Sequence, residues 1–515
     1  MWDQKYTNEL HKKNTEAQAG GGEARVNKQH NAGKLTARER IELLFDPNTF
    51  VEIGIIREAK ASLTGLQTSN PIPGDGVVTG YGRINGRVVY AASQDFTVNG
   101  GTLGEAHSLK ICRIMDMALD ALCPFISIND SGGARIEEGI NSLSGYSGIF
   151  LRNTRASGVI PQISVIMGPC AGGACYSPAI SDFVFMVENT SQMFITGPLV
   201  VKEVTGEETI AEKLGGAGIH TQKSGVAHFS YKSDKECLEA VRLLLSYLPQ
   251  NNQHRPDHKE TKIVDGSNNL EEIVPDNMKK GYDVHKVIET FIDKETFFEV
   301  SPKYAQNVVV GFSRIDGDVI GIVANQPQVA AGTLDVNSSD KAARFVRFCD
   351  CFNIPILSLV DVPGYMPGTR QEHEGIIRHG AKLLYAYSEA TVPKVSLIMR
   401  KAYGGAYIAM NSKNMGADLV FAWPIAQLAV MGAEGAVEII YKKQLKSSEN
   451  PKEEKDRLDA DYEEKYLKPY IAAANGYIDD VIEASETRKR ISDAFASLKT
   501  KKKENLWKKH GNIPL

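Results

Sequence analysis

The sequence lacks most of the short motifs by which common enzyme classes are recognised. It contains no G-x-x-x-x-G-K-[ST] phosphate loop and no G-x-S-x-G nucleophile turn. The nearest approach to a dinucleotide fingerprint, residues 80–86, misses the required spacing by one residue and falls in a predicted hairpin. His373 and His379 are six positions apart instead of the four of a zinc helix, and they suit a solvated helix face better. We therefore expect no metal site.

Cysteine is scarce and shows no pairing pattern. The chain has 7 cysteines among 515 residues and no C-x-x-C, which argues against a disulfide framework and a zinc ribbon. This usage favours a reduced, cytoplasmic setting. The polar N-terminus predicts no signal peptide. The weakly charged run 167–187 is interrupted by Pro169, Pro178 and Asp182, so it indicates strands and a helix, not a membrane span.

Neither sign of charge dominates the chain. A net charge of −4 gives no support for a nucleic-acid partner. The basic run 499–509 is expected to be a solvated helix face and tail. A hydrophobic content of 42% is that of a globular protein, and 515 residues are too many for one core, so two domains are expected.

What the sequence does contain is a long internal duplication. Residues 80–92 match residues 311–324, and each segment predicts a β-hairpin with a turn at N-G or D-G. The offset of 231 positions holds through two further matches and becomes 232 at the paired glycines Gly172 and Gly404. A period this long indicates two copies of one domain.

An earlier match indicates where the two copies differ in length. Residues 46–52 match residues 293–299 at an offset of 247, so the first copy must carry an insertion before residue 80. The polar stretch 249–270 suits a linker. We place the domains at residues 1–258 and 259–515.

Each copy alternates short apolar strands with helical patterns, which indicates an α/β domain with crossover connections. Two strands in each copy end in a glycine-containing turn. The turns are residues 130–135 and 168–174 in the first copy, and residues 361–365 and 401–406 in the second. Backbone N–H groups at such turns are free to bind an anion. If the two turns of a copy converge, they form an oxyanion hole, in which each donor contributes on the order of 3–4 kcal/mol.

Few side chains near these turns suggest acid–base or nucleophilic chemistry. Ser131 stands beside glycines, but no histidine or lysine motif accompanies it to activate a nucleophile. Arg135, Glu137 and Glu138 suit surface charges at a helix N-terminus better than acid–base groups. A site with many glycines and no acid–base pair is consistent with catalysis by backbone donors.

These turns and three further motifs together resemble the carboxyltransferase subunits of biotin-dependent acyl-CoA carboxylases and decarboxylases. The family includes propionyl-CoA carboxylase beta chains and methylmalonyl-CoA decarboxylase alpha subunits. The further motifs are Gly33–Arg40, Ala429–Ala436 and the closing Lys508–Leu515. The likeness runs in family order over essentially the whole chain.

The resemblance implies two tandem crotonase-like domains of the ClpP/crotonase superfamily. It also implies a homohexamer in which the N-terminal half of one subunit faces the C-terminal half of another. The N-terminal hole would hold the thioester carbonyl of acyl-CoA, through Gly132, Gly133, Ala134 and Arg135 with Gly172 and Gly173. The C-terminal hole would hold the ureido oxygen of biotin, through Val362, Gly364, Tyr365, Gly404 and Ile408 with Gly405 and Ala406.

The substrate and the partners follow from the same resemblance. Propionyl-CoA carboxylases often carry Asp where this chain has Ile408, whose apolar side chain resembles that of decarboxylases and transcarboxylases. We expect propionyl-CoA and methylmalonyl-CoA as the substrate pair, in either direction of transfer. No A-M-K-M biotinylation motif occurs, so biotin would arrive on a separate carrier protein. A biotin carboxylase or a sodium-pumping membrane decarboxylase subunit would complete the complex.

Other functions remain open on the sequence alone. One alternative is a crotonase-like hydrolase or serine peptidase that uses Ser131 as its nucleophile. Another is an acetyl-CoA or other acyl-CoA carboxylase subunit, although no zinc ribbon precedes the domain as it does in split bacterial acetyl-CoA carboxylases. The third is a scaffold protein that binds no acyl-CoA, which micromolar binding of propionyl-CoA in a calorimetric titration would exclude.

Overall fold

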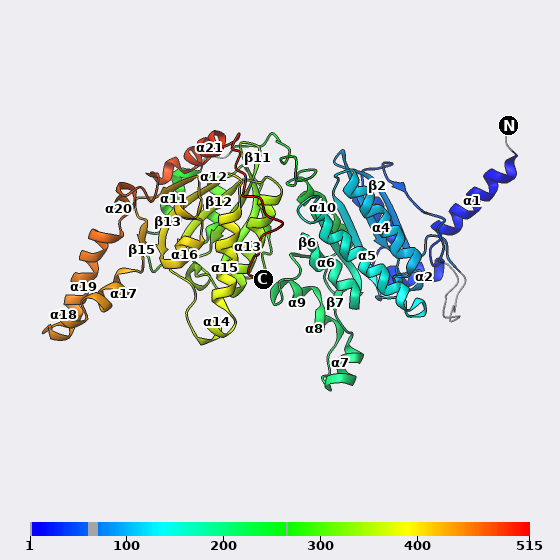
Figure 1. Ribbon diagram of the computed structural model, residues 1–515, viewed down its shortest axis with the longest axis horizontal. Helices are drawn as coiled ribbons and strands as arrows, with labels where there is room; N and C mark the ends of the chain where they lie inside the picture. The colour runs from blue at the N-terminus through cyan, green and yellow to red at the C-terminus, as the bar shows by residue number, and fades with distance from the viewer. Residues whose placement is uncertain (1–2, 60–70, 264–265) are drawn as a thin grey trace. The chain divides into compact units, whose positions relative to one another are not determined.

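A computed structural model describes residues 3–59, 71–263 and 266–515 of the chain (Figure 1). The chain divides into two compact units, Met1–Arg255 and Pro256–Leu515. The division falls within the polar stretch 249–270. Among the described residues, no helix is long and apolar enough to cross a membrane.

The N-terminal unit is built on one sheet, which has eight strands in its described part, in the order β1-β2-β3-β4-β5-β6-β8 with β7 paired to β5. The first three strands are antiparallel, and parallel pairing begins between β3 and β4. The strands are β1 (Val51–Glu52), β2 (Val77–Ile84), β3 (Arg87–Gln94), β4 (Phe125–Ser131), β5 (Gln162–Ala171), β6 (Phe183–Val187), β7 (Gln192–Phe194) and β8 (Phe229–Tyr231).

Helices cover this sheet, and α7 extends away from it (Figure 1). The buried faces of α4 and α5 pack with the sheet to form the core of the unit. The helices are α1 (Gln4–Gln18), α2 (Glu23–Asn31), α3 (Ala37–Leu44), α4 (Glu105–Asp120), α5 (Ile140–Ala156), α6 (Tyr176–Ile180), α7 (Pro198–Thr205), α8 (Ala211–Gly215), α9 (Ala217–Gln222) and α10 (Asp234–Leu245).

The C-terminal unit repeats this sheet strand for strand, in the order β16-β14-β13-β12-β11-β10-β9 with β15 paired to β13. The predicted duplication is therefore confirmed in the topology. The strands are β9 (Phe298–Val300), β10 (Val308–Ile315), β11 (Asp318–Asn325), β12 (Ile356–Val362), β13 (Lys394–Tyr403), β14 (Leu419–Ala422), β15 (Gln427–Ala429) and β16 (Asp480–Val481).

The helices of the C-terminal unit cover its sheet, while α18 and α19 extend away from it (Figure 1). They are α11 (Leu270–Ile273), α12 (Val284–Phe291), α13 (Val336–Cys351), α14 (Thr369–His373), α15 (Ile376–Glu389), α16 (Gly404–Ala409), α17 (Ala433–Ile440), α18 (Lys442–Ser447), α19 (Pro451–Tyr462), α20 (Pro469–Ala474) and α21 (Thr487–Ser497).

Both predicted hairpins are present. β2 and β3 join through Asn85 and Gly86, and β10 and β11 join through Asp316 and Gly317, all four with positive φ. These left-handed pairs give the type I′ turn that suits the twist of a two-residue hairpin.

The early sequence match has a structural reason in these hairpins. The Asp46 carboxylate accepts hydrogen bonds from the turn N–H groups of the first hairpin, and the Asp293 carboxylate does so for the second. Arg242 of α10 binds Asp46 at 2.8 Å, and Arg488 of α21 binds Asp293 at the same distance. The last long helix of each unit is thereby tied to its first hairpin.

The insertion predicted in the first copy lies between β1 and β2. β1 ends at Glu52 and β2 begins at Val77, whereas only residues 301–307 separate β9 from β10. Part of the inserted stretch, residues 60–70, lies outside the described residues.

The basic C-terminal run differs from the prediction of a solvated helix face and tail. Helix α21 ends at Ser497, so the run lies beyond the helix. Lys501 is largely buried and pairs with Asp418 at 2.7 Å, while Lys508 pairs with Glu389. The tail is held against its unit because carboxylates of that unit match its charges.

In each unit a charged contact joins the helix that precedes the first strand to that strand. Arg38 of α3 pairs with Glu52 at 2.6 Å, and His285 of α12 lies 2.9 Å from Glu299 and 2.8 Å from Asp283. The hydrogen bond to Glu299, supported by Asp283 and opposed by partial burial, raises the pKa of His285 to about 9.

The raised pKa of His285 predicts a pH-dependent stability. Because the folded value lies above the ordinary 6.5, the stabilisation is complete below pH 6.5 and is lost as the pH rises through 9. We expect the difference in unfolding free energy between the wild type and His285→Gln to fall by about 1–2 kcal/mol over this range, a discounted value because 34% of the side chain is exposed.

Urea denaturation at a series of pH values measures this difference. Arg38→Gln is the matched control, because a guanidinium keeps its charge throughout the range and the difference should stay flat. An equally flat difference for His285→Gln would contradict the ion pairs of His285.

Candidate functional site

The two central strands of each unit slip out of register at their C-terminal ends. The β4–β5 ladder pairs Asn129 with Ile166 and next Ser131 with Cys170, so β5 carries two extra residues at this point. The β12–β13 ladder slips in the same way between the pairs Val360–Ile398 and Val362–Ala402. Such bulges bend a strand and redirect the chain beyond it, and here a glycine turn comes after each one.

The second turn of each unit contains a left-handed glycine directly after the strand ends. Gly172 has φ +63° and Gly404 has φ +59°, a conformation that strains any residue with a side chain. The short 3₁₀ segment Gly172–Cys175 and then α6 follow in the N-terminal unit, and α16 follows in the C-terminal unit. The first N–H groups of these segments, including those of Gly173 and Gly405, have no acceptor within their own helix.

The two turns of each unit lie close together, which is the condition that an oxyanion hole requires. A Cβ built on Gly133 would lie 2.9 Å from the carbonyl oxygen of Ala171, which immediately precedes Gly172. In the C-terminal unit, a Cβ on Gly405 would lie 3.9 Å from the ring of Tyr365. Each pair of turns therefore forms one local surface.

Most backbone donors of the first N-terminal turn are already engaged. The N–H groups of Gly132, Gly133 and Arg135 donate to Gly100 O, Ser131 Oγ and Leu103 O respectively, at 2.9–3.1 Å. Within the described part of the chain, no hydrogen bond engages the N–H of Ala134. Leu103 bridges this turn by bonding to Gly133 O and to the N–H of Arg135, the residues on either side of Ala134. The N–H of Ala134 itself therefore faces away from Leu103.

The equivalent C-terminal turn leaves more donors free. Leu334 bridges Tyr365 as Leu103 bridges Ala134, and the N–H of Met366 donates to Leu334 O. Across the described ranges, no hydrogen bond engages the N–H groups of Gly364 or Tyr365. Pro363 has no N–H to give.

The side chains beside the N-terminal turn offer no activated nucleophile. Ser131 is fully buried, and its hydroxyl accepts the N–H of Gly133 at 3.1 Å. Among the described residues, no histidine or lysine bonds to it. A Cβ on Gly173 would lie 3.2 Å from the ring of Tyr146, whose pKa burial raises further above its ordinary value. Tyr146 therefore stays protonated at neutral pH.

The side chains beside the C-terminal turn are equally poor bases. Burial raises the pKa of Tyr365 to about 12 and that of Tyr407 to about 12. Val362 and Ala406 are fully buried, while Gly404 is half-buried and Gly405 is exposed. Ile408 is 44% exposed at the end of this turn, where a ligand can reach it.

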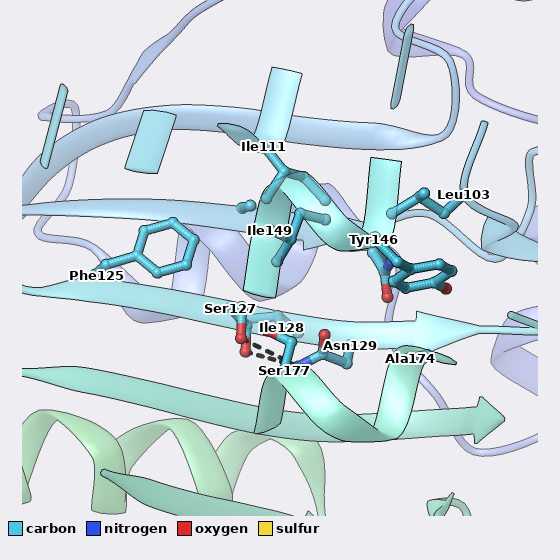
Figure 2. Close-up of a pocket in the computed structure, with 12 residues that line it drawn as sticks. Leu103, Ile111, Phe125, Ser127, Ile128, Asn129, Tyr146, Ile149, Ala174 and Ser177 are labelled. Atoms are coloured by element: carbon cyan, nitrogen blue, oxygen red, sulfur yellow. Dashed lines mark hydrogen bonds between the residues drawn. The ribbon is translucent and has the colours of Figure 1, made fainter. Parts of the chain in front are cut away.

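A small cavity lies behind the N-terminal turn (Figure 2). Its volume of about 20 Å³ suits a single water molecule. Tyr146, Ile149 and Ala174 line it together with Ser127 and Asn129, which are hydrogen-bonded to each other (Figure 2). An acyl group does not fit there, so a ligand must approach the turn from the solvent side.

A buried carboxylate is the first residue of the first turn in each unit. Asp130 is fully buried, bound by Lys34 and by Arg40 at 2.9 Å each, and Arg40 also binds Asp234 at 2.8 Å. Burial lowers the pKa of Lys34, and the attraction of Asp130 only partly offsets this effect.

The carboxylate of the C-terminal unit, Asp361, is bound from a different direction. Arg400 binds it at 2.9 Å and Lys401 lies 3.6 Å from it, both on the neighbouring strand β13. The N–H of Lys401 also donates to Asp361, at 3.2 Å. Burial lowers the pKa of the Lys401 ammonium, and the attraction of Asp361 only partly offsets this effect.

Arg135 is not the surface charge that the sequence suggested. The residue is only 7% exposed, and its guanidinium binds Asp75 at 2.8 Å, Glu138 at 2.7 Å and Thr102 O at 2.9 Å. It is buried because this segment, residues 132–135, folds back over the loop before α4. Glu137 and Glu138 are half-buried.

The buried cations around Asp130 were missed by reasoning from sequence. Lys34 and Arg40 lie in the motif Gly33–Arg40, but no spacing rule connects them with a residue about a hundred positions away. The repeat did carry one signal. Asp130 and Asp361 are equivalent residues, but the arginine that pairs with Asp361, Arg400, is replaced by Gly168 in the first copy. An unmatched buried Asp needs a cation from elsewhere. In the described part of the chain, no cluster of three or more potential metal ligands occurs.

Comparison with known proteins connects this geometry to a family. A family model described as the carboxyl transferase domain matches residues 28–513. The carboxyltransferase subunit of propionyl-CoA carboxylase from Haloferax mediterranei is 55% identical over 512 residues, with 98% of each chain covered. The alpha subunit of methylmalonyl-CoA decarboxylase from Veillonella parvula is 53% identical over 513 residues, again with 98% of each chain covered.

A solved structure agrees with the fold. Transcarboxylase 12S, described as a hexamer and solved with methylmalonyl-CoA and methylmalonic acid bound, has a TM-score of 0.95 at 50% identity. The match covers 99% of this chain and 98% of that one. The predicted fold, an α/β chain of two crotonase-like domains, is confirmed. The chain belongs to the carboxyl transferase family, a family of enzymes, as its motifs indicated.

Proposed function

We propose that the protein transfers a carboxyl group between N-carboxybiotin on a separate carrier protein and the α-carbon of a short acyl-CoA. The observation that carries this proposal is the two matched pairs of glycine turns, one pair in each unit, with no activated side chain beside either pair among the described residues. The reaction places negative charge on one oxygen of each partner, and each pair of turns offers backbone donors for one of them.

We assign the acyl-CoA thioester to the site that the two turns of the N-terminal unit form. The donors that the structure leaves for its oxygen are the N–H groups of Ala134 and Gly173, because those of Gly132, Gly133 and Arg135 are engaged. As the α-carbon loses its proton, the thioester oxygen gains charge and these donors bind it more tightly than in the ground state. Arg135 then acts by holding the turn in place.

We assign the ureido oxygen of biotin to the site that the two turns of the C-terminal unit form. The free N–H groups of Gly364, Tyr365, Gly405 and Ala406 fit a carbonyl oxygen that gains negative charge, and the adjacent phenols stay protonated. Carboxybiotin supplies carbon dioxide and then accepts the α-proton, so the protein needs no base of its own. Val362 and Gly404 shape this turn.

We propose propionyl-CoA and methylmalonyl-CoA as the substrate pair. The names of the relatives and the ligand of transcarboxylase 12S support this choice. An acetyl-CoA or other acyl-CoA carboxylase subunit is the alternative.

The partners decide the direction of transfer. With a biotin carboxylase the complex would carboxylate propionyl-CoA in the cytoplasm. With a sodium-pumping membrane subunit it would decarboxylate methylmalonyl-CoA at the membrane. We propose a homohexamer, as in transcarboxylase 12S. Sodium-dependent decarboxylation by the native complex would support the second partner, and ATP-dependent carboxylation without a sodium requirement would support the first.

The biotin assignment predicts the effect of a side chain at Gly405. Gly405→Val should lower carboxyl exchange between methylmalonyl-CoA and free biotin by at least about 100-fold, because its side chain occupies the place of the ureido oxygen. Calorimetry should show an unchanged affinity for propionyl-CoA. Gly405→Ala controls for folding, since its Cβ would lie at an ordinary 3.9 Å from Tyr365. Unchanged exchange in the valine variant would refute the assignment.

The absence of a nucleophile predicts that Ser131 is dispensable for chemistry. Ser131→Ala removes one hydrogen bond to the N–H of Gly133, so label exchange between methylmalonyl-CoA and propionyl-CoA with free biotin should fall by less than about tenfold. Retained exchange would exclude the hydrolase or peptidase alternative, whereas complete loss in a variant that still folds, as judged by circular dichroism, would contradict the conclusion that Ser131 is dispensable.

A further inference from the structure

The buried carboxylates Asp130 and Asp361 stand at the point where the two central strands slip. Each is the first residue of its turn and is the one that the shifted ladder leaves unpaired. Neither residue has any solvent-accessible surface. Their N–H groups donate to Gln94 and Asn325, equivalent residues of β3 and β11, at 3.2 Å in both units.

In the C-terminal unit, the ion pair connects the two turns directly. Asp361 belongs to β12, immediately before Val362, and Arg400 belongs to β13, four residues before Gly404. The remaining guanidinium contacts hold Arg400 in place: its Nη1 donates to Pro275 O, Asn277 O and Lys280 O at 2.9–3.1 Å. This buried ion pair and the N–H of Lys401, which also donates to Asp361, together hold the two turns at a set distance.

In the N-terminal unit, a residue from outside the strands makes the same connection. Arg40 of α3 donates to Asp130 of β4 at 2.9 Å and to the carbonyl oxygen of Met167, on β5, at 2.7 Å. β5 cannot provide its own arginine here, because a Cβ on Gly168 would lie 1.8 Å from the Asp130 carboxylate. Lys34 adds a second cation at 2.9 Å.

We propose that Asp130 with Arg40, and Asp361 with Arg400, are positioning residues that set the two oxyanion holes independently of each other. The inference rests on the proposed function, since it assigns one substrate to each hole. Breaking one pair should misplace the donors of its own unit and leave those of the other unit unchanged. A misplacement of about 1 Å is enough to lower a rate about 100-fold.

Two matched variants, Asp130→Asn and Asp361→Asn, test this independence. Each keeps the shape of the side chain and removes its charge. Both should lower kcat for carboxyl exchange with free biotin, by up to about 100-fold. The Kd of propionyl-CoA, measured by calorimetry, should rise about tenfold in Asp130→Asn alone, and the KM of free biotin should rise about tenfold in Asp361→Asn alone.

Controls separate positioning from general destabilisation. Asp293→Asn removes another fully buried carboxylate that pairs with an arginine, Arg488 at 2.8 Å, but at the hairpin end of its unit. It should lower the melting temperature and leave the Kd and the KM unchanged. Arg40→Lys and Arg400→Lys keep the cation but not all the contacts of the guanidinium, so their activity should lie between that of the wild type and that of the Asn variants.

The possible outcomes distinguish the inference from the proposed function. If both Asn variants change the Kd and the KM together, or change neither, the inference is wrong. If Asp361→Asn fails to fold, Lys401→Met, which removes an ammonium 3.6 Å from Asp361, gives the same readout. If the wild type exchanges no carboxyl group, the proposed function is wrong, and the Kd of propionyl-CoA in Asp130→Asn still tests the N-terminal half of the inference.

Discussion

The two-residue slip between the central strands of each unit is the constraint on which the candidate site depends. It brings one carboxylate into the interior and forces the following strand to turn through a left-handed glycine. A regular ladder would pair the backbone groups at these strand ends with each other. The slip instead redirects the chain into the glycine turns, where the first N–H groups of the following helices can bind an oxygen, and a buried ion pair lies at the same point.

Duplication gave the chain two such arrangements, and their surroundings have since diverged. In the first unit, Ser131 and Gly100 take up two N–H groups of the turn, and the balancing cation comes from α3. In the second unit, Pro363 has no N–H to donate, and the cation that balances Asp361 comes from β13. The two units therefore have the same strand slip and glycine turn but offer different N–H donors. This difference suits a reaction with two unlike oxyanions.

Local signals in the sequence were sufficient for much of the fold. The N-G and D-G turns predicted both hairpins, and the glycine pairs marked the strand ends, because glycine and turn residues act through their own φ angles. Contacts between distant residues were not predictable in this way. Lys34 reaches Asp130 across 96 positions, and the burial of Arg135 depends on Asp75, 60 positions earlier. Nothing in the local pattern specifies either contact, nor which turn N–H groups stay free.

A structure of the protein with propionyl-CoA and biotin bound together tests the central claim most directly, which is that each hole binds one of the two oxygens. We expect the thioester oxygen within hydrogen-bonding distance, about 2.7–3.2 Å, of the N–H groups of Ala134 and Gly173. The ureido oxygen should lie at the same distance from Gly405 and Ala406. Either oxygen at the other turn, or a thioester bound by the Ser131 hydroxyl, would contradict it.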